Sequence, residues 1–194
     1  MLIKSRCDRG GVAYFCKLKY SNLKKIYKPT ETVAPFYQRY INQVPDDGNL
    51  LIYLEDIISE TEELISPLSE EKMHFRYSPG KWTIKDMLVH MSDTERIFVY
   101  RALRFSRGDE TPLPGFDEGL FAKNAHANER EKEDILREFS LVRHSSIAFI
   151  ETLTDDDLDR KGSANGYPVS VRLIANLIYG HHRHHINIIR ERYL

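Results

Sequence analysis

Four of the eight histidines fall within residues 181–185, near the end of the 194-residue chain. If this segment is helical, His181 and His185 lie one turn apart and continue a series of apolar residues spaced three and four apart. That series consists of Val171, Ile174, Ile178 and Ile188. Two imidazoles on one helical face can share a metal ion, whereas a buried pair without a partner would leave ring nitrogens unsatisfied. The spacing therefore favours a metal site over a structural pair.

The other two histidines of this segment point away from that face. His182 is expected at the protein surface, whereas His184 lies close enough to substitute for a ligand or to support one. Because histidine-rich segments are often only solvent-exposed surface, a metal site also needs a third ligand from elsewhere in the chain.

Four segments with helical periodicity predict an all-α protein, a four-helix bundle with long crossover connections. They span about residues 50–65, 83–108, 129–153 and 169–192. Thr83 is the expected N-cap of the second helix, with Asp86 as its capping-box partner. A shorter helical turn is expected after Thr154. No segment alternates apolar and polar residues for long enough to predict a sheet.

The third ligand is expected from the second helix, where His90 lies in the middle of the predicted segment. His90 reaches the depth of His181 and His185 if the second and fourth helices pack side by side. Three histidines with an open position are typical of a catalytic rather than a structural metal site. His74, His126 and His144 are weaker candidates, because they fall in connections or on a predicted solvent-exposed face.

Composition limits the classes of protein that need to be considered. The chain is 41% hydrophobic and 29% charged, which is typical of one globular domain, and its formal net charge of −1 gives no general attraction to nucleic acid or anionic lipid. Cys7 and Cys16 match no metal or redox spacing, and no apolar run is long enough to span a membrane or to act as a secretory signal. We therefore expect a cytoplasmic protein with no membrane partner.

Residues 1–28 form a basic segment in which no helical or strand periodicity is sustained. A poorly ordered tail, an extension upstream of the natural start, and an arm that docks through Tyr14, Phe15 and Tyr20 are the three interpretations. The first two are favoured over the arm. The bundle domain is accordingly predicted to comprise residues 29–194.

The sequence also resembles the DinB-like superfamily of metalloenzymes, which includes the YfiT-like thiol transferases. Two histidine motifs, residues 82–93 and 180–185, carry the resemblance. Further similarity to one DinB-like subgroup lies in residues 95–104, 112–117, 165–172 and 189–194. The resemblance covers residues 28–194 and leaves the basic segment unexplained.

The resemblance implies a four-helix bundle that binds one divalent metal through His90, His181 and His185. Neutral imidazoles bind several divalent metals, so the ligands alone do not fix the metal. Zinc or nickel is expected first, with iron, copper or manganese as alternatives. His182 departs from the subgroup, in which glutamate is common at this position, and the segment is not the His-Glu-x-x-His motif of zinc proteases.

Several polar residues near the predicted site have two interpretations each. Asp93, nearly one turn beyond His90, is either a catalytic group that orients a ligand or accepts a proton, or a surface carboxylate. Glu95 falls at a core-like position and needs a partner, most simply an arginine. The arginines near the site either bind an anionic substrate group or pair with carboxylates; they are Arg101, Arg104 and Arg172. The aromatic residues Phe116 and Tyr167, in the connections 109–128 and 154–168, are expected to line a pocket mouth.

Three functions are compared. The leading hypothesis is a metal-dependent hydrolase or a thiol S-transferase acting on a small molecule, with a low-molecular-weight thiol as a partner and a homodimer allowed. The alternative is a non-catalytic metal-binding or stress-response module with a structural metal. A nucleic-acid partner is disfavoured by the charge balance of the chain.

Overall fold

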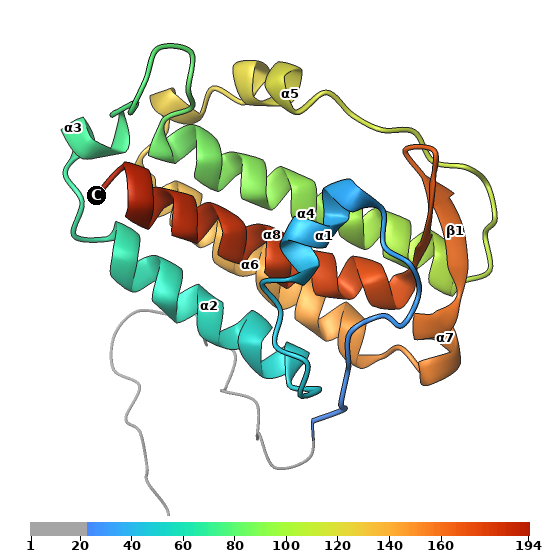
Figure 1. The fold of residues 1–194 in the computed structure, drawn as a ribbon. Coiled ribbons are helices and arrows are strands. Elements are labelled where there is room, and N and C mark those ends of the chain that lie inside the picture. Colours follow the sequence, from blue (N-terminus) through green and yellow to red (C-terminus); the bar gives the residue numbers. More distant parts are fainter. Residues whose placement is uncertain (1–22) are drawn as a thin grey trace, which may run out of the picture.

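The computed structural model of the protein describes residues 23–194, and four long helices dominate it (Figure 1). They are α2 (Leu50–Ile65), α4 (Ile84–Ser106), α6 (Lys132–Glu151) and α8 (Val171–Arg192). Helix α8 packs against α4 and α2, and each of these packs against α6. The first two long helices, α2 and α4, and the last two, α6 and α8, are therefore diagonal to each other in the bundle. The predicted all-α bundle with long crossover connections is confirmed.

Local capping explains where the helices begin. The Thr83 hydroxyl accepts a hydrogen bond from the Asp86 backbone N–H at 3.0 Å, and the Asp86 carboxylate accepts one from the Thr83 N–H at 3.0 Å. This is the predicted capping box, which satisfies two backbone donors at the start of α4. Thr154 and Asp157 form an equivalent box that starts the short helix α7 (Asp155–Asp159), so the helical turn expected there is confirmed.

The remaining short helices have little periodic signal in the sequence. They are α1 (Pro35–Ile41), α3 (Glu70–Met73), α5 (Glu118–Asn124) and a 3₁₀-helix (Ala127–Glu129). Helix α5 lies within the connection 109–128, and the 3₁₀-helix spans its end, although no helix was predicted there. None of the α5 residues is buried, so no apolar stripe marks this helix.

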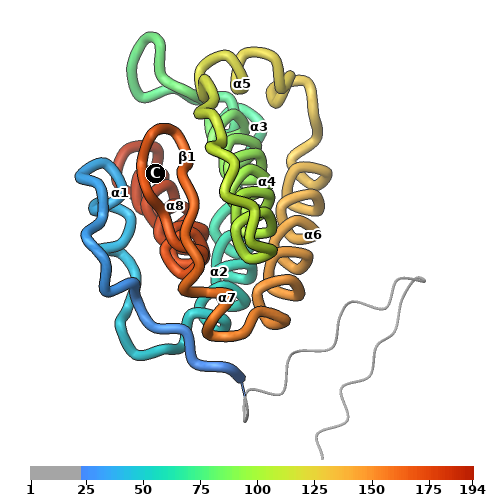
Figure 2. Tube along the Cα trace, turned by 90° about the vertical axis from the view of Figure 1, so that its right-hand side faces the viewer, coloured from blue at the N-terminus to red at the C-terminus, as the bar shows by residue number. Residues whose placement is uncertain are grey.

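The prediction that no sheet forms is wrong, because β1 (Lys161–Ala164) and β2 (Tyr167–Ser170) form an antiparallel hairpin. Its turn is Asn165-Gly166, with φ angles of 54° and 78°. Asn-Gly favours such two-residue turns because both positions require a positive φ, and this signal identifies the hairpin from the sequence. Leu113 pairs with the hairpin: its N–H donates to the Ser163 carbonyl at 2.9 Å. The connection 109–117 is thereby fixed to the hairpin, as the two traces in Figure 2 show.

Helix α1 crosses over α8 on the face seen in Figure 1. Gly180 permits this close approach, since a Cβ atom at this position would lie 2.2 Å from the Tyr40 carbonyl oxygen. The side chain of Tyr40 thereby packs beside α8 near the histidine-rich segment.

Two apolar clusters fill the bundle, and buried polar residues separate them along three of the helices. On α2, Thr61 lies between Ile58 of one cluster and Ile65 of the other. On α4 the interval contains Ser92, Thr94 and Glu95, with His90 one turn before them, and on α8 it contains His181, His182 and His185. The helices thus bring a layer of polar side chains together inside an otherwise apolar core.

The folded part of the chain begins earlier than the predicted boundary at residue 29. Ile26 is only 2% exposed, and its N–H donates to the Gly48 carbonyl at 2.9 Å. The predicted basic extension therefore includes residues that pack on the bundle. Residues 1–22, with Tyr14, Phe15 and Tyr20, lie outside the described part of the chain.

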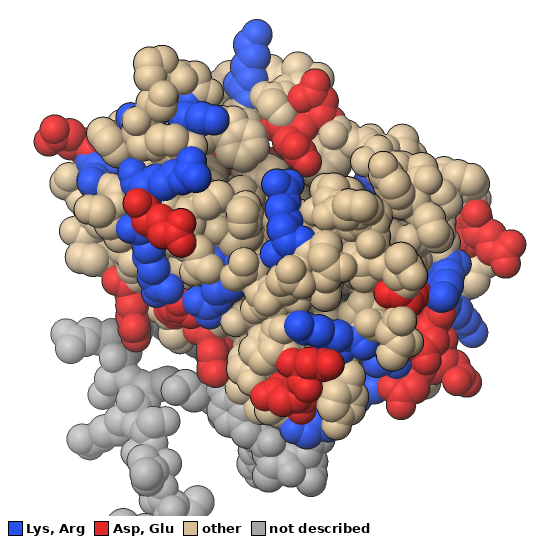
Figure 3. All heavy atoms as spheres, in the orientation of Figure 1, with Lys and Arg blue, Asp and Glu red and all other residues tan. Residues whose placement is uncertain are grey.

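Among residues 23–194, no helix is long and apolar enough to cross a membrane. Acidic and basic side chains are interspersed over the face of the molecule drawn in Figure 3, which has no extended patch of one charge.

Candidate metal centre

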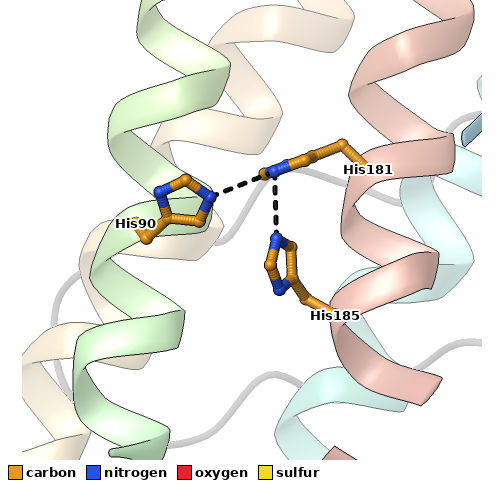
Figure 4. Close-up of side chains that lie close together, drawn as sticks. All are labelled: His90, His181 and His185. Carbon is orange, nitrogen blue, oxygen red and sulfur yellow. Dashed lines mark hydrogen bonds between the residues drawn. The ribbon is translucent and has the colours of Figure 1, made fainter. Parts of the chain in front are cut away.

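Helices α4 and α8 bring three predicted ligands together. Figure 4 shows the ring of His90 directed from α4 toward the rings of His181 and His185 on α8. The Nε2 atom of His181 lies 3.1 Å from Nε2 of His90 and 3.0 Å from Nε2 of His185. Within residues 23–194 this is the one group of three or more His, Cys, Asp or Glu residues whose ligand atoms lie within 4.8 Å of one another. We call these residues the histidine trio.

Burial keeps the trio neutral. His90, His181 and His185 are 7%, 6% and 9% exposed. Loss of solvation lowers the pKa of His90 to about 4 and lowers the pKa values of His181 and His185 well below the usual value of 6.5. Neutral imidazoles have the lone pairs that a metal ion requires, so the trio is in the ligating form at neutral pH.

Neighbouring side chains fix the rings of the trio. Trp82 packs on the His90 ring with 4.6 Å between centroids, and Tyr40 contacts the His181 ring edge-on at 5.2 Å. The Thr94 hydroxyl lies 3.5 Å from Nδ1 of His90. Nδ1 of His185 is buried without a hydrogen-bond partner among the described residues.

Asp93 is not brought to the trio. Its carboxylate accepts a hydrogen bond from Arg96 at 3.2 Å, on the face of α4 that adjoins Glu138 of α6. Partial burial raises the pKa of Asp93, and the charge of Arg96 opposes this shift. The placement matches the surface-carboxylate interpretation rather than the catalytic one.

The other histidines lie outside the trio as well. The half-buried His184 packs its ring against those of Tyr40 and His185, at 5.3 Å in both cases. Each of three further histidines forms a hydrogen bond with a residue three or four positions away in the sequence; they are His74, His126 and His144.

The expected surface position of His182 is wrong, because its side chain is only 1% exposed. Nε2 of His182 lies 2.8 Å from the Thr61 hydroxyl of α2, and Nδ1 lies 3.5 Å from the Arg143 guanidinium of α6. Position 182 also belongs to a second apolar series on α8, which the first series concealed. That series consists of Ala175, Tyr179, Ile186 and Ile189.

Glu95 has the arginine partner that its position requires. Arg143 donates three hydrogen bonds to the Glu95 carboxylate, at 2.8, 2.9 and 3.1 Å, and both side chains are buried. Glu95, Arg143, His182 and Thr61 thus link all four long helices beside the trio. Sequence reasoning predicted the need for an arginine but did not identify Arg143.

A pocket adjoins the trio through His181 and lies between α4, α1, the connection 109–117 and the hairpin. Five aromatic rings line it: Phe36, Tyr37, Tyr40, Phe98 and Phe116. Its polar lining consists of Thr94, Arg101, Glu118 and Asn165. Phe116 thus lines a pocket as expected, whereas Tyr167 lies beside Phe36 with ring centroids 6.3 Å apart.

The three arginines near the site differ in their partners. Arg104 pairs with Asp109, and Arg172 pairs with Asp159. Arg101 instead donates a hydrogen bond from Nη2 to the Pro114 carbonyl at 2.7 Å.

Comparison with known proteins shows similarity to one family and to individual proteins. The sequence profile of the DinB superfamily matches residues 53–189. A protein of Oceanobacillus iheyensis, OB0413, named as a candidate metal-dependent hydrolase, is 23% identical over 150 residues, which cover 76% of this chain and 85% of that protein. The structure of YfiT from Bacillus subtilis superposes with a TM-score of 0.67 at 20% identity, covering 85% of this chain and 90% of that one. YfiT is described as a probable metal-dependent hydrolase with an unusual four-helix bundle topology.

Proposed function

The chain belongs to the DinB superfamily, and on that premise we propose that it is a metal-dependent hydrolase of small molecules whose divalent ion is bound by His90, His181 and His185. The observation that carries the proposal is the convergence of three neutral Nε2 atoms from two adjacent helices. Of the proteins that this chain resembles, OB0413 is named as a candidate metal-dependent hydrolase and YfiT is described as a probable one.

The donor set fits a first-row divalent ion, and we propose zinc or nickel as the resident metal. A bound ion would act as a Lewis acid that polarises the scissile bond. Trp82, Tyr40 and Thr94 hold the imidazoles in place, and the two apolar clusters bury the helices that carry them.

An open position favours catalysis over a structural metal. Structural zinc sites fill four positions with protein ligands, whereas catalytic sites keep one free. The described residues supply three ligands at this place, and a pocket of about 40 Å³ reaches one of them, His181. We therefore propose that substrate enters through this pocket.

Metal analysis tests the proposal directly. Purified wild-type protein is expected to bind about one equivalent of zinc or nickel, and His90→Ala, His181→Ala and His185→Ala are each expected to lose most of it. His184→Ala is the matched control, since this histidine lies on the same helix outside the trio. Circular dichroism verifies that each variant is folded. Full metal retention in all three trio variants would refute the site.

A second measurement separates catalyst from structural module. We expect the visible spectrum of the cobalt-substituted protein to change when 2-mercaptoethanol is added and to stay constant with ethylene glycol, because an open position accepts a thiolate. A spectrum that no added ligand alters would identify a closed, structural metal.

A further inference from the structure

Two arginines are buried among residues 23–194, and only one of them has an acidic partner. Arg143, fully buried, is paired with the Glu95 carboxylate through three hydrogen bonds. Arg101 is 5% exposed and forms no ion pair with any described carboxylate. A buried guanidinium without a compensating anion is unfavourable. The protein therefore sustains an unbalanced positive charge at Arg101.

The unbalanced charge lies at the pocket beside the trio. Arg101 and His181 both line this pocket. The single hydrogen bond from Nη2 to Pro114 leaves other N–H groups of the guanidinium without a protein acceptor among the described residues. Burial lowers the pKa of Arg101, yet a guanidinium remains protonated at neutral pH.

We propose that Arg101 binds a carboxylate group of the substrate, and that the enzyme acts on carboxylic acids with an apolar or aromatic body. The inference rests on the proposed function for the place of the reacting group, which is the trio. The guanidinium fork matches the two oxygens of a carboxylate and supplies the counter-charge that the protein lacks.

The lining of the pocket narrows the class of ligand. Arg101 is the only arginine or lysine among the described residues of the lining, and the exposed carboxylate of Glu118 lies on the same pocket. Arg101 supplies one buried positive charge and the nearby Glu118 carboxylate repels additional negative charge, so a monoanion such as a carboxylate is favoured over a phosphate dianion. The pocket encloses about 40 Å³, which accommodates the carboxylate end of a ligand, and the rings of Tyr37, Tyr40, Phe98 and Phe116 suit an adjoining apolar or aromatic body.

Position along α4 sets a lower limit on ligand size. Arg101 follows His90 by eleven positions, so the two Cα atoms lie about 16 Å apart along the helix. The two side chains cover part of this distance. A molecule that contacts both groups must therefore be longer than its carboxylate alone, which makes phenylacetate a better probe than acetate.

The test measures discrimination between an acid and its neutral amide. Isothermal titration of metal-free and zinc-loaded protein with phenylacetate and phenylacetamide separates binding by Arg101 from binding by the metal. We expect the wild type to bind phenylacetate at least about tenfold more tightly in both forms, as a charge-assisted hydrogen-bonded pair requires. Arg101→Gln is expected to remove this preference in the metal-free protein, and Arg101→Lys to restore part of it.

The matched control is Arg104→Gln, because Arg104 lies on the same helix but pairs with Asp109 outside the pocket. This variant is expected to behave as the wild type. A merely structural role of Arg101 in holding Pro114 would lower stability in Arg101→Gln without affecting the ratio of the two affinities. If Arg101→Gln fails to fold, the ratio of the wild-type affinities for phenylacetate and phenylacetamide decides whether the pocket prefers a carboxylate.

Equal wild-type affinities for acid and amide, no measurable binding of the acid, or an unchanged ratio in Arg101→Gln would overturn the inference. Failure of the proposed function has a different result, namely wild-type protein that binds no metal. In that case a preference for the acid that depends on Arg101 would still establish the carboxylate site.

Discussion

Replacement of Arg143 by methionine tests whether the buried ion pair is required by the fold. Both partners are almost fully buried, with Arg143 at 0% and Glu95 at 3% exposure. Removing one partner of such a pair leaves an uncompensated charge in the core, which typically costs about 3–5 kcal/mol. For a protein of this size each kcal/mol lowers the melting temperature by about 2–4 °C, so a decrease of about 6–20 °C is expected.

Urea denaturation followed by circular dichroism measures this cost. Arg96→Met is the control, since Arg96 is 46% exposed and its ion pairs should contribute no more than about 1 kcal/mol. The double variant Glu95→Met/Arg143→Met removes both charges and should be more stable than Arg143→Met alone. A cost below about 1 kcal/mol for Arg143→Met, or a double variant as unstable as the sum of its single changes, would refute this reasoning.

Two further predictions concern packing and pH. Gly180→Ala should lower the free energy of unfolding, measured by urea denaturation, by about 1–3 kcal/mol and should expose α1 to protease, because the new Cβ would lie 2.2 Å from the Tyr40 carbonyl oxygen. Gly119→Ala on the exposed helix α5 is the control. Equal stability of the two variants would contradict the contact. The metal-free protein should lose stability as pH falls from about 6.5 toward 4. In the unfolded chain His90 is protonated near its usual pKa of 6.5, whereas in the folded chain its pKa is about 4. An unfolding free energy that stays constant between pH 7.5 and 5, measured by urea denaturation in EDTA, would contradict this prediction.

The long helices and the trio were predictable from the sequence because they depend on local periodicity. The spacing of His181 and His185, the position of His90 and the Thr83–Asp86 capping box all follow from the geometry of single helices. The prediction that the three histidines converge needed one further assumption, that α4 and α8 pack side by side. The two helices do pack in this way.

The remaining features depend on contacts between segments far apart in the chain. His182 was misplaced because α8 packs against both α2 and α4, so a single apolar stripe does not describe it. Arg143 lies 48 residues from Glu95 and no local pattern links the two. The hairpin was predictable from Asn165-Gly166, whereas the pairing of its strand with Leu113 was not.

Part of the pocket wall lies outside the two helices that carry the trio. All three histidines lie on α4 and α8, whereas Gly115, Phe116 and Asn165 of the wall come from the connection 109–117 and the hairpin, which are joined through Leu113. Residues such as Phe116 and Asn165 can therefore be exchanged without altering the backbone that positions the imidazoles. This separation gives the scaffold high evolvability: variation in two surface segments can reshape the pocket while the trio is inherited intact. It also marks those segments as the places to randomise when the proposed activity is to be redirected by laboratory selection.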